Sequence, residues 1–66
     1  MEAIGERIKF IRQSNSMTQL AFSKKIGISR VTLSLLESGK HKPSLSTIRL
    51  IALLFNIEEN WIRYGK

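Results

Sequence analysis

The stretch TQLAFSKKIGISRVTLSLLESG, residues 18–39, decides the fold. It divides into two short helical segments that meet at Gly27. Two packed helices joined by a tight turn need a residue that accepts a positive φ, and glycine does so without steric penalty. Thr18 and Ser29 stand before the segments as N-caps, because a hydroxyl there can accept a hydrogen bond from a backbone N–H of the first turn. The stretch predicts a helix-turn-helix unit over about 18–38, whose second helix begins at Arg30.

The N-terminal part carries the pattern of one more helix. Three apolar residues recur at steps of four and three: Ile4, Ile8 and Ile11. This spacing predicts one apolar face of a helix over residues 3–14. Three basic residues are expected off that face: Arg7, Lys9 and Arg12. Asn15 and Ser16 close the helix, since asparagine tolerates the left-handed conformation at a helix end.

Two more helices are expected in the C-terminal part. Gly39 ends the two-helix unit and opens a polar loop, after which Ser44 begins a fourth helix that ends at Asn56. Its apolar content predicts the most buried helix of the bundle. The residues expected along its inner side are Leu45, Ile48, Ile51, Ala52 and Phe55, widened by Leu50, Leu53 and Leu54. A short last helix starts at about Glu59, so the expected fold class is all-α, a compact five-helix bundle in one domain over residues 1–66.

The positive charge is concentrated in one part of the chain. Eleven Lys and Arg against five acidic residues give a net charge of +6, of which residues 1–42 hold +5 and residues 43–66 hold +1. An excess of basic residues favours polyanionic partners such as DNA. Because the excess lies in residues 1–42, we expect DNA to bind the part of the chain that holds the two-helix unit. A basic surface that serves only solubility is the alternative.

Sequence features argue against disulfide bonds, thiolate metal sites, secretion and membrane binding. Without cysteine there is neither a disulfide framework nor a thiolate metal site, which suits a reducing cytoplasm. The N-terminus is no secretory signal, and the longest apolar run, residues 50–55, is too short to cross a membrane. Gly27, Gly39 and Pro43 break any long amphipathic helix that would lie on a membrane surface. We expect a soluble cytoplasmic protein without a membrane partner.

Catalytic chemistry has no constellation of residues to support it. The chain has no HExxH motif and no paired-carboxylate pattern, and Glu37 is the one acidic residue of the two-helix unit. His41 is a single histidine in a basic loop. We therefore expect no enzyme, no catalytic or metal-binding residue, no cofactor and no small-molecule ligand.

The chain resembles the helix-turn-helix regulators of the lambdoid phage repressor and Cro type, also called the xenobiotic-response-element type. The resemblance covers nearly the whole chain. The residues that carry it are Thr18-Gln19, Phe22, Gly27-Ile28-Ser29, Thr32-Leu33-Ser34, Leu36-Glu37, Gly39-Lys40, Pro43-Ser44-Leu45 and Asn60-Trp61-Ile62. It implies a five-helix domain that binds DNA as a two-fold dimer, with the third helix (about 30–37) in the major groove.

The outer face of the third helix is expected to contact base edges. The resemblance implies these contacts for Arg30, Val31 and Leu35, and helical geometry adds Ser34. Arg30 can donate two hydrogen bonds to O6 and N7 of guanine; a phosphate contact or a solvated side chain is the alternative. Val31 and Leu35 offer no hydrogen bonds, so they are expected to contact a thymine methyl group or respond to DNA shape. For Leu35 the alternative is a half-buried residue at the helix edge.

A second set of residues is expected to contact the DNA backbone. Its members are Gln19, Ser29, Thr32, Ser38, Lys40 and Lys42. Gln19 stands in the first turn of its helix, where family members hold a phosphate with help from the helix dipole. Each neutralised phosphate releases counterions, so binding is expected to weaken steeply with salt. Arg12 and Glu37 match a structural pair that joins the first and third helices in the family.

The resemblance also implies a homodimer, formed through the loop before the last helix and that helix itself. The residues expected there are Ile57, Glu58 and Ile62.

The expected function is a bacterial or phage-encoded transcriptional regulator, a repressor that binds a pseudo-palindromic operator. A restriction-modification controller, an antitoxin and an interaction module without DNA specificity are the alternatives. Phe10 and Leu20 fall outside the predicted apolar faces, either as scattered exposed residues or as a partner surface.

Overall fold

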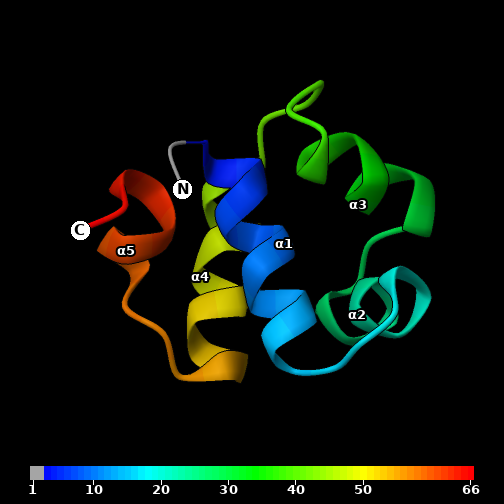
Figure 1. The fold of residues 1–66 in the computed structure, drawn as a ribbon, viewed down its shortest axis with the longest axis horizontal. Coiled ribbons are helices and arrows are strands. Elements are labelled where there is room, and N and C mark those ends of the chain that lie inside the picture. Colours follow the sequence, from blue (N-terminus) through cyan, green and yellow to red (C-terminus); the bar gives the residue numbers. More distant parts are fainter. Residues whose placement is uncertain (1–2) are drawn as a thin grey trace.

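Five helices follow one another along the computed structural model, which describes residues 3–66. They are α1 (Ile4–Ser14), α2 (Gln19–Ile26), α3 (Arg30–Glu37), α4 (Leu45–Phe55) and α5 (Glu59–Tyr64). No strand occurs within residues 3–66, and the predicted all-α five-helix bundle is confirmed. Residues 1 and 2 of the expected domain lie outside the described part. Figure 1 shows α1 in the middle, with α5 on one side and α2 and α3 on the other.

One apolar core joins all five helices. Its buried members are Ile8, Ile11, Phe22, Ile26, Leu33, Ile48, Ile51 and Ile62. In so short a chain the core is small, and each fully buried side chain of this size contributes about 1.5–3 kcal/mol. The rings of Phe22 and Phe55 stack at 5.0 Å between centroids, which joins α2 to α4.

The expected burial of α4 was wrong in part. Only Ile48 and Ile51 are buried, whereas Leu45, Leu53 and Leu54 are 40%, 78% and 41% exposed. Leu53 lies about 140° around the helix from Ile48 at 100° per residue. In a bundle this small no further helix covers that side, so the run of leucines does not become a buried helix.

The left-handed residue at the end of α1 is Ser16 rather than Asn15. Ser16 has φ of 56°, whereas Asn15 has φ of −97° and donates from its side-chain amide to the carbonyl of Ile11 at 2.7 Å. The N–H of Met17 bonds to the carbonyl of Arg12, and the N–H of Ser16 to that of Gln13. This is the Schellman pattern, in which the position after the C-cap takes the left-handed conformation.

Arg7 was expected off the apolar face but is only 4% exposed. Its Nε donates to the carbonyl oxygen of Ile62 at 2.7 Å, and its Nη2 donates to that of Arg63 at 2.9 Å. The last carbonyls of a helix have no partner within it. Arg7 supplies these missing donors and thereby fastens α5 to α1.

Gly5 brings the start of α1 against the end of α3. A Cβ atom at this position would overlap the carbonyl oxygen of Leu36 and lie 3.0 Å from that of Glu37. Both neighbours are backbone atoms, which cannot turn aside as a flexible side chain could. Position 5 therefore sets how closely α1 approaches α3.

We expect Gly5→Ala to destabilise the protein by about 1–3 kcal/mol, because relief of the clash must shift backbone. Helix propensity alone would favour alanine by about 1 kcal/mol. Urea unfolding followed by Trp61 fluorescence measures the free energy of unfolding. Ser14→Ala, at an exposed position at the end of α1, is the control and should stay within about 0.5 kcal/mol of wild type. A Gly5→Ala protein as stable as wild type would refute the close-approach argument.

Candidate nucleic-acid interface

The turn between α2 and α3 is built by two hydroxyl caps and one glycine. Thr18 Oγ1 accepts from the N–H of Ala21 at 3.1 Å, and Ser29 Oγ accepts from that of Thr32 at 3.0 Å. Gly27 takes the left-handed conformation with φ of 76°. The N–H of Ile28 then bonds to the carbonyl of Ser23 at 3.0 Å. The helix-turn-helix unit expected over about 18–38 thus has a hydroxyl cap at the start of each helix and a fixed turn between them.

The two faces of α3 differ in burial. Leu33 and Leu36 are 0% and 3% exposed and point into the bundle. Of the residues expected to contact bases, Arg30 is exposed and Val31 is 60% exposed at the N-terminal end of the helix. Ser34 and Leu35 are half-buried, one turn further along. Arg30 and Val31 are thus the two most accessible residues of this set.

The residues expected to contact the DNA backbone flank this face. Gln19 begins α2, and Ser38, Lys40 and Lys42 are exposed at the end of α3 and in the loop that follows. Two backbone N–H groups of this loop, those of Lys40 and His41, bond to the carbonyl of Leu35 at 3.0 and 3.2 Å. The start of the basic loop is therefore held against the end of α3.

Three hydroxyl groups of the interface, those of Ser29, Thr32 and Ser38, already have partners within the chain. Ser29 Oγ lies 2.8 Å from Thr32 Oγ1 in addition to its cap bond. Ser38 Oγ donates to the carbonyl of Leu35 at 3.1 Å. A phosphate contact by Ser38 would require its hydroxyl to turn away from that carbonyl, whereas the lysines of the loop are accessible as they stand.

Arg12 and Glu37 form an ion pair that joins α1 to α3. Arg12 Nε donates to Oε2 of Glu37 at 2.7 Å, and Nη2 donates to Oε1 at 3.0 Å. The remaining Nη1 donates to the carbonyl of Met17 at 3.0 Å. The side chains are only 12% and 4% exposed. Hydrogen bonding to Glu37 raises the pKa of Arg12, and the charge attraction adds to this against the lowering effect of burial.

Gln19 belongs to the same network, which sequence analysis missed. Its Nε2 donates to Oε1 of Glu37 at 3.2 Å, and its Oε1 accepts from Nη1 of Arg30 at 3.5 Å. These residues are 18 and 11 positions away in the chain, and no periodicity or motif connects them. Only the packing of α2 against α3 brings them together.

The expected dimer residues do not share one surface. Ile62 is 0% exposed and belongs to the core, so its side chain is unavailable to a partner and that prediction is corrected. Ile57 is half-buried and packs against the core, while Glu58 is exposed before α5. Near the end of α4, Leu53 and Leu54 are exposed apolar residues that the sequence analysis had placed inside.

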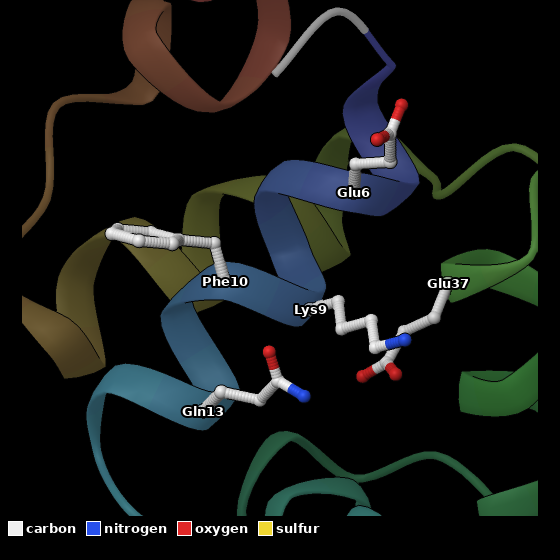
Figure 2. Close-up of a pocket in the computed structure, with 5 residues that line it drawn as sticks. All are labelled: Glu6, Lys9, Phe10, Gln13 and Glu37. Carbon is white, nitrogen blue, oxygen red and sulfur yellow. The ribbon is translucent and has the colours of Figure 1, made fainter.

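One small pocket of about 310 Å³ lies where α1 faces the end of α3. It is lined by Glu6, Lys9, Phe10, Gln13 and Glu37, and Figure 2 shows Lys9 extending toward Glu37 while Phe10 points to the other side. Phe10 is 47% exposed, and its ring centroid lies 6.0 Å from that of Trp61.

Among residues 3–66 no three metal-ligating side chains cluster closely enough to hold an ion. In the same range no helix has the length and apolarity needed to span a membrane.

A family model described as helix-turn-helix matches residues 8–62. The chain belongs to this family. The resemblance to phage-repressor-type regulators drawn from the sequence is thereby confirmed, and the match spans all the residues expected to contact DNA.

Relatives of this helix-turn-helix protein include regulators and an antitoxin. Antitoxin PezA of Streptococcus pneumoniae is 41% identical over 54 residues, which cover 82% of this chain and 34% of that protein. An uncharacterized HTH-type transcriptional regulator of Archaeoglobus fulgidus is 44% identical over 50 residues, or 76% of this chain and 70% of that one. The immunity repressor protein of Bacillus phage phi105 is 36% identical over 55 residues, covering 83% and 38%. The chain thus spans less than two fifths of the antitoxin and of the immunity repressor.

Solved structures share the fold. The solution structure of the DNA-binding domain of the P22 c2 repressor matches with a TM-score of 0.87 and 23% identity, over 97% of this chain and 84% of that one. The crystal structure of the P22 c2 repressor with a synthetic operator matches with a TM-score of 0.84 and 22% identity, over 94% of each chain. The five-helix arrangement is therefore shared with the DNA-binding domain of the P22 c2 repressor.

Removal of one partner of the Arg12–Glu37 pair is expected to destabilise the protein strongly. Arg12→Met leaves the Glu37 carboxylate buried without its cation, which costs about 3–5 kcal/mol. Arg49→Met makes the same change in an ion pair with Glu59 whose side chains are 63% and 31% exposed, and should cost less than about 1 kcal/mol. Urea unfolding of both variants makes the comparison. Equal losses would mean that the buried pair does not hold α3.

Proposed function

We propose that this chain is a sequence-specific DNA-binding transcriptional regulator that lays α3 in the major groove of its operator. The observation that carries the proposal is the split of α3 into a buried face and an outer end that presents Arg30 and Val31. Side chains without a role in the core are free to contact bases, and a capped, packed helix presents them in a fixed direction. Residues 1–66 would form one such domain.

Base recognition is assigned to four outer residues of α3. Arg30 would donate two hydrogen bonds to guanine, a contact that discriminates by about 1–3 kcal/mol. Val31 and Leu35 would contact thymine methyl groups, and Ser34 would donate or accept one hydrogen bond at a neighbouring base pair. The exposed position of Val31 supports its place in this set.

Phosphate contacts would fix the helix in the groove. We assign them to Gln19, Ser29, Thr32, Ser38, Lys40 and Lys42. The exposed lysines after α3 support this assignment because they stand beside the recognition helix on a loop bonded to it. Such contacts carry no sequence information but set register and affinity.

A homodimer would place two copies of α3 about 34 Å apart on a pseudo-palindromic operator. We assign its interface to Ile57 and Glu58, extended by the exposed Leu53 and Leu54. The eight residues from 50 to 57 carry no charge. Two copies of a chain with a net charge of +6 would repel each other least at such a neutral surface.

The proposed action is repression by occupation of a promoter in the bacterial cytoplasm. Similarity to the phage phi105 immunity repressor protein supports this choice. A second candidate is the DNA-binding part of an antitoxin, which the 41% identity to antitoxin PezA favours. Both candidates use the same interface on α3.

Selection from a random duplex library tests the proposal. The wild-type chain should enrich an inverted repeat with half-sites about one helical turn apart. Arg30→Ala should lose the preference for guanine at one base pair of each half-site, by about 5- to 150-fold. The same selection at two salt concentrations should show affinity falling steeply with salt in both proteins.

The control for this selection is Arg49→Ala, which removes an arginine from the outer side of α4. It should enrich the wild-type motif. Enrichment of no motif by the wild type, with binding only at low salt, would reject sequence-specific regulation in favour of an interaction module.

Val31 gives a second prediction, on the selected operator. Replacement of a contacted thymine by deoxyuracil removes only the methyl group, and should weaken binding by about two- to tenfold through loss of one apolar contact. In Val31→Ala the same replacement should have little effect, because the partner of the methyl group is already gone. If uracil weakens both proteins equally, Val31 does not contact that base.

A further inference from the structure

A buried arginine of α1 connects the helix beside the proposed dimer surface to the helix that holds α3. α5 begins directly after Glu58, one of the residues assigned to that surface, and its end is bonded to Arg7. On its other side (Figure 1), α1 contacts α3 through Gly5 and through the Arg12–Glu37 pair. We propose that Arg7 is a positioning residue that sets the spacing between the two half-sites of the operator. The proposal rests on the dimeric DNA-binding function proposed above.

Apolar packing by itself does not fix the direction of α5. Of its six residues, Glu59–Tyr64, all of which the structure describes, only Ile62 is buried, and Trp61 packs beside it half-buried. Burial of an apolar side chain is favourable in any direction that removes it from water. A helix of under two turns held in this way could pivot about Ile62, and Glu58 at its N-cap would move with it.

The two hydrogen bonds of Arg7 remove this freedom. Nε donates to the carbonyl oxygen of Ile62 at 2.7 Å, and Nη2 donates to that of Arg63 at 2.9 Å. Both nitrogens belong to one rigid, planar guanidinium, and the two carbonyls follow each other along the helix. Two bonds from one plane to two points fix the direction of α5 as well as its position. Since Arg7 is only 4% exposed, water competes little for either carbonyl.

The direction of α5 affects operator choice because half-site spacing changes in whole base pairs. In the proposed dimer each α3 is joined to the interface through α1 and α5 of its own chain. One base pair added between the half-sites moves them apart by about 3.4 Å and turns them by about 35° about the DNA axis. A dimer with α5 held in one direction fits one spacing. A pivoting α5 would absorb part of the displacement, so the preference for that spacing would weaken.

The test compares the full chain with Arg7→Met and with Lys24→Met as the matched control. Each variant loses one positive charge, and Lys24 is exposed on α2. Affinity is measured for duplexes that carry the selected half-sites at the selected spacing and at one base pair more or less. Arg7→Met is expected to lower the preference for the selected spacing by about 3- to 10-fold, with the preference for guanine at the Arg30 position unchanged. Lys24→Met should lower affinity equally at all three spacings, since the lost charge acts on phosphates.

A purely structural role for Arg7 gives a different result, because a smaller folded fraction lowers affinity by the same factor at every spacing. Circular dichroism at the temperature of the binding measurement gives the folded fraction. If Arg7→Met is unfolded, Arg7→Lys replaces it, because its ammonium keeps the charge but lacks the planar fork that bonds to both carbonyls. The preference for the selected spacing should again fall.

A folded Arg7 variant with the wild-type spacing preference would overturn this inference, while the proposed function stands. A wild-type chain that binds inverted repeats equally well at all three spacings would overturn it too. A wild-type chain that enriches no inverted repeat would overturn the proposed dimeric regulator itself, so the two failures are distinguishable.

Discussion

The orientation of α3 depends on one buried contact between charged groups. Arg12 and Glu37 meet with two hydrogen bonds at 2.7 and 3.0 Å, and the third nitrogen of Arg12 is held by a backbone carbonyl. Close by, the backbone of Gly5 lies directly against the carbonyls at the end of α3. The first contact fixes direction and the second fixes distance. Together they hold α3 on α1, the helix at the centre of the bundle (Figure 1).

Local signals in the sequence predicted the order and the ends of the helices. The hydroxyl caps at Thr18 and Ser29 and the left-handed Gly27 depend on nearest neighbours in the chain, and the structure forms them all. Burial was less predictable, because it depends on which helices lie alongside. Leu53 is as apolar as the residues of the core, yet it is exposed because no other helix packs on its side of α4.

In the candidate site, too, some features could be predicted from the sequence and others depend on how the helices pack. Helical periodicity correctly placed Arg30 and Val31 on the outer side of α3, and the family resemblance supplied the Arg12–Glu37 pair that the structure contains. The contacts of Gln19 could not be deduced from the chain. They arise from the angle at which α2 crosses α3, and that angle is a property of the packed bundle. The prediction that Ile62 lies in a dimer interface was wrong for the same reason. The packed bundle buries this side chain in the core.

The two-sided character of α3 has a consequence for how such a protein changes over time. Stability is carried by Leu33 and Leu36, which are 0% and 3% exposed, whereas Val31 is 60% exposed and contributes little to the core. Under the proposed function, mutations on the outer side alter the preferred operator at almost no cost in the free energy of folding. A new binding specificity can then arise by single substitutions, and the protein stays folded at each step.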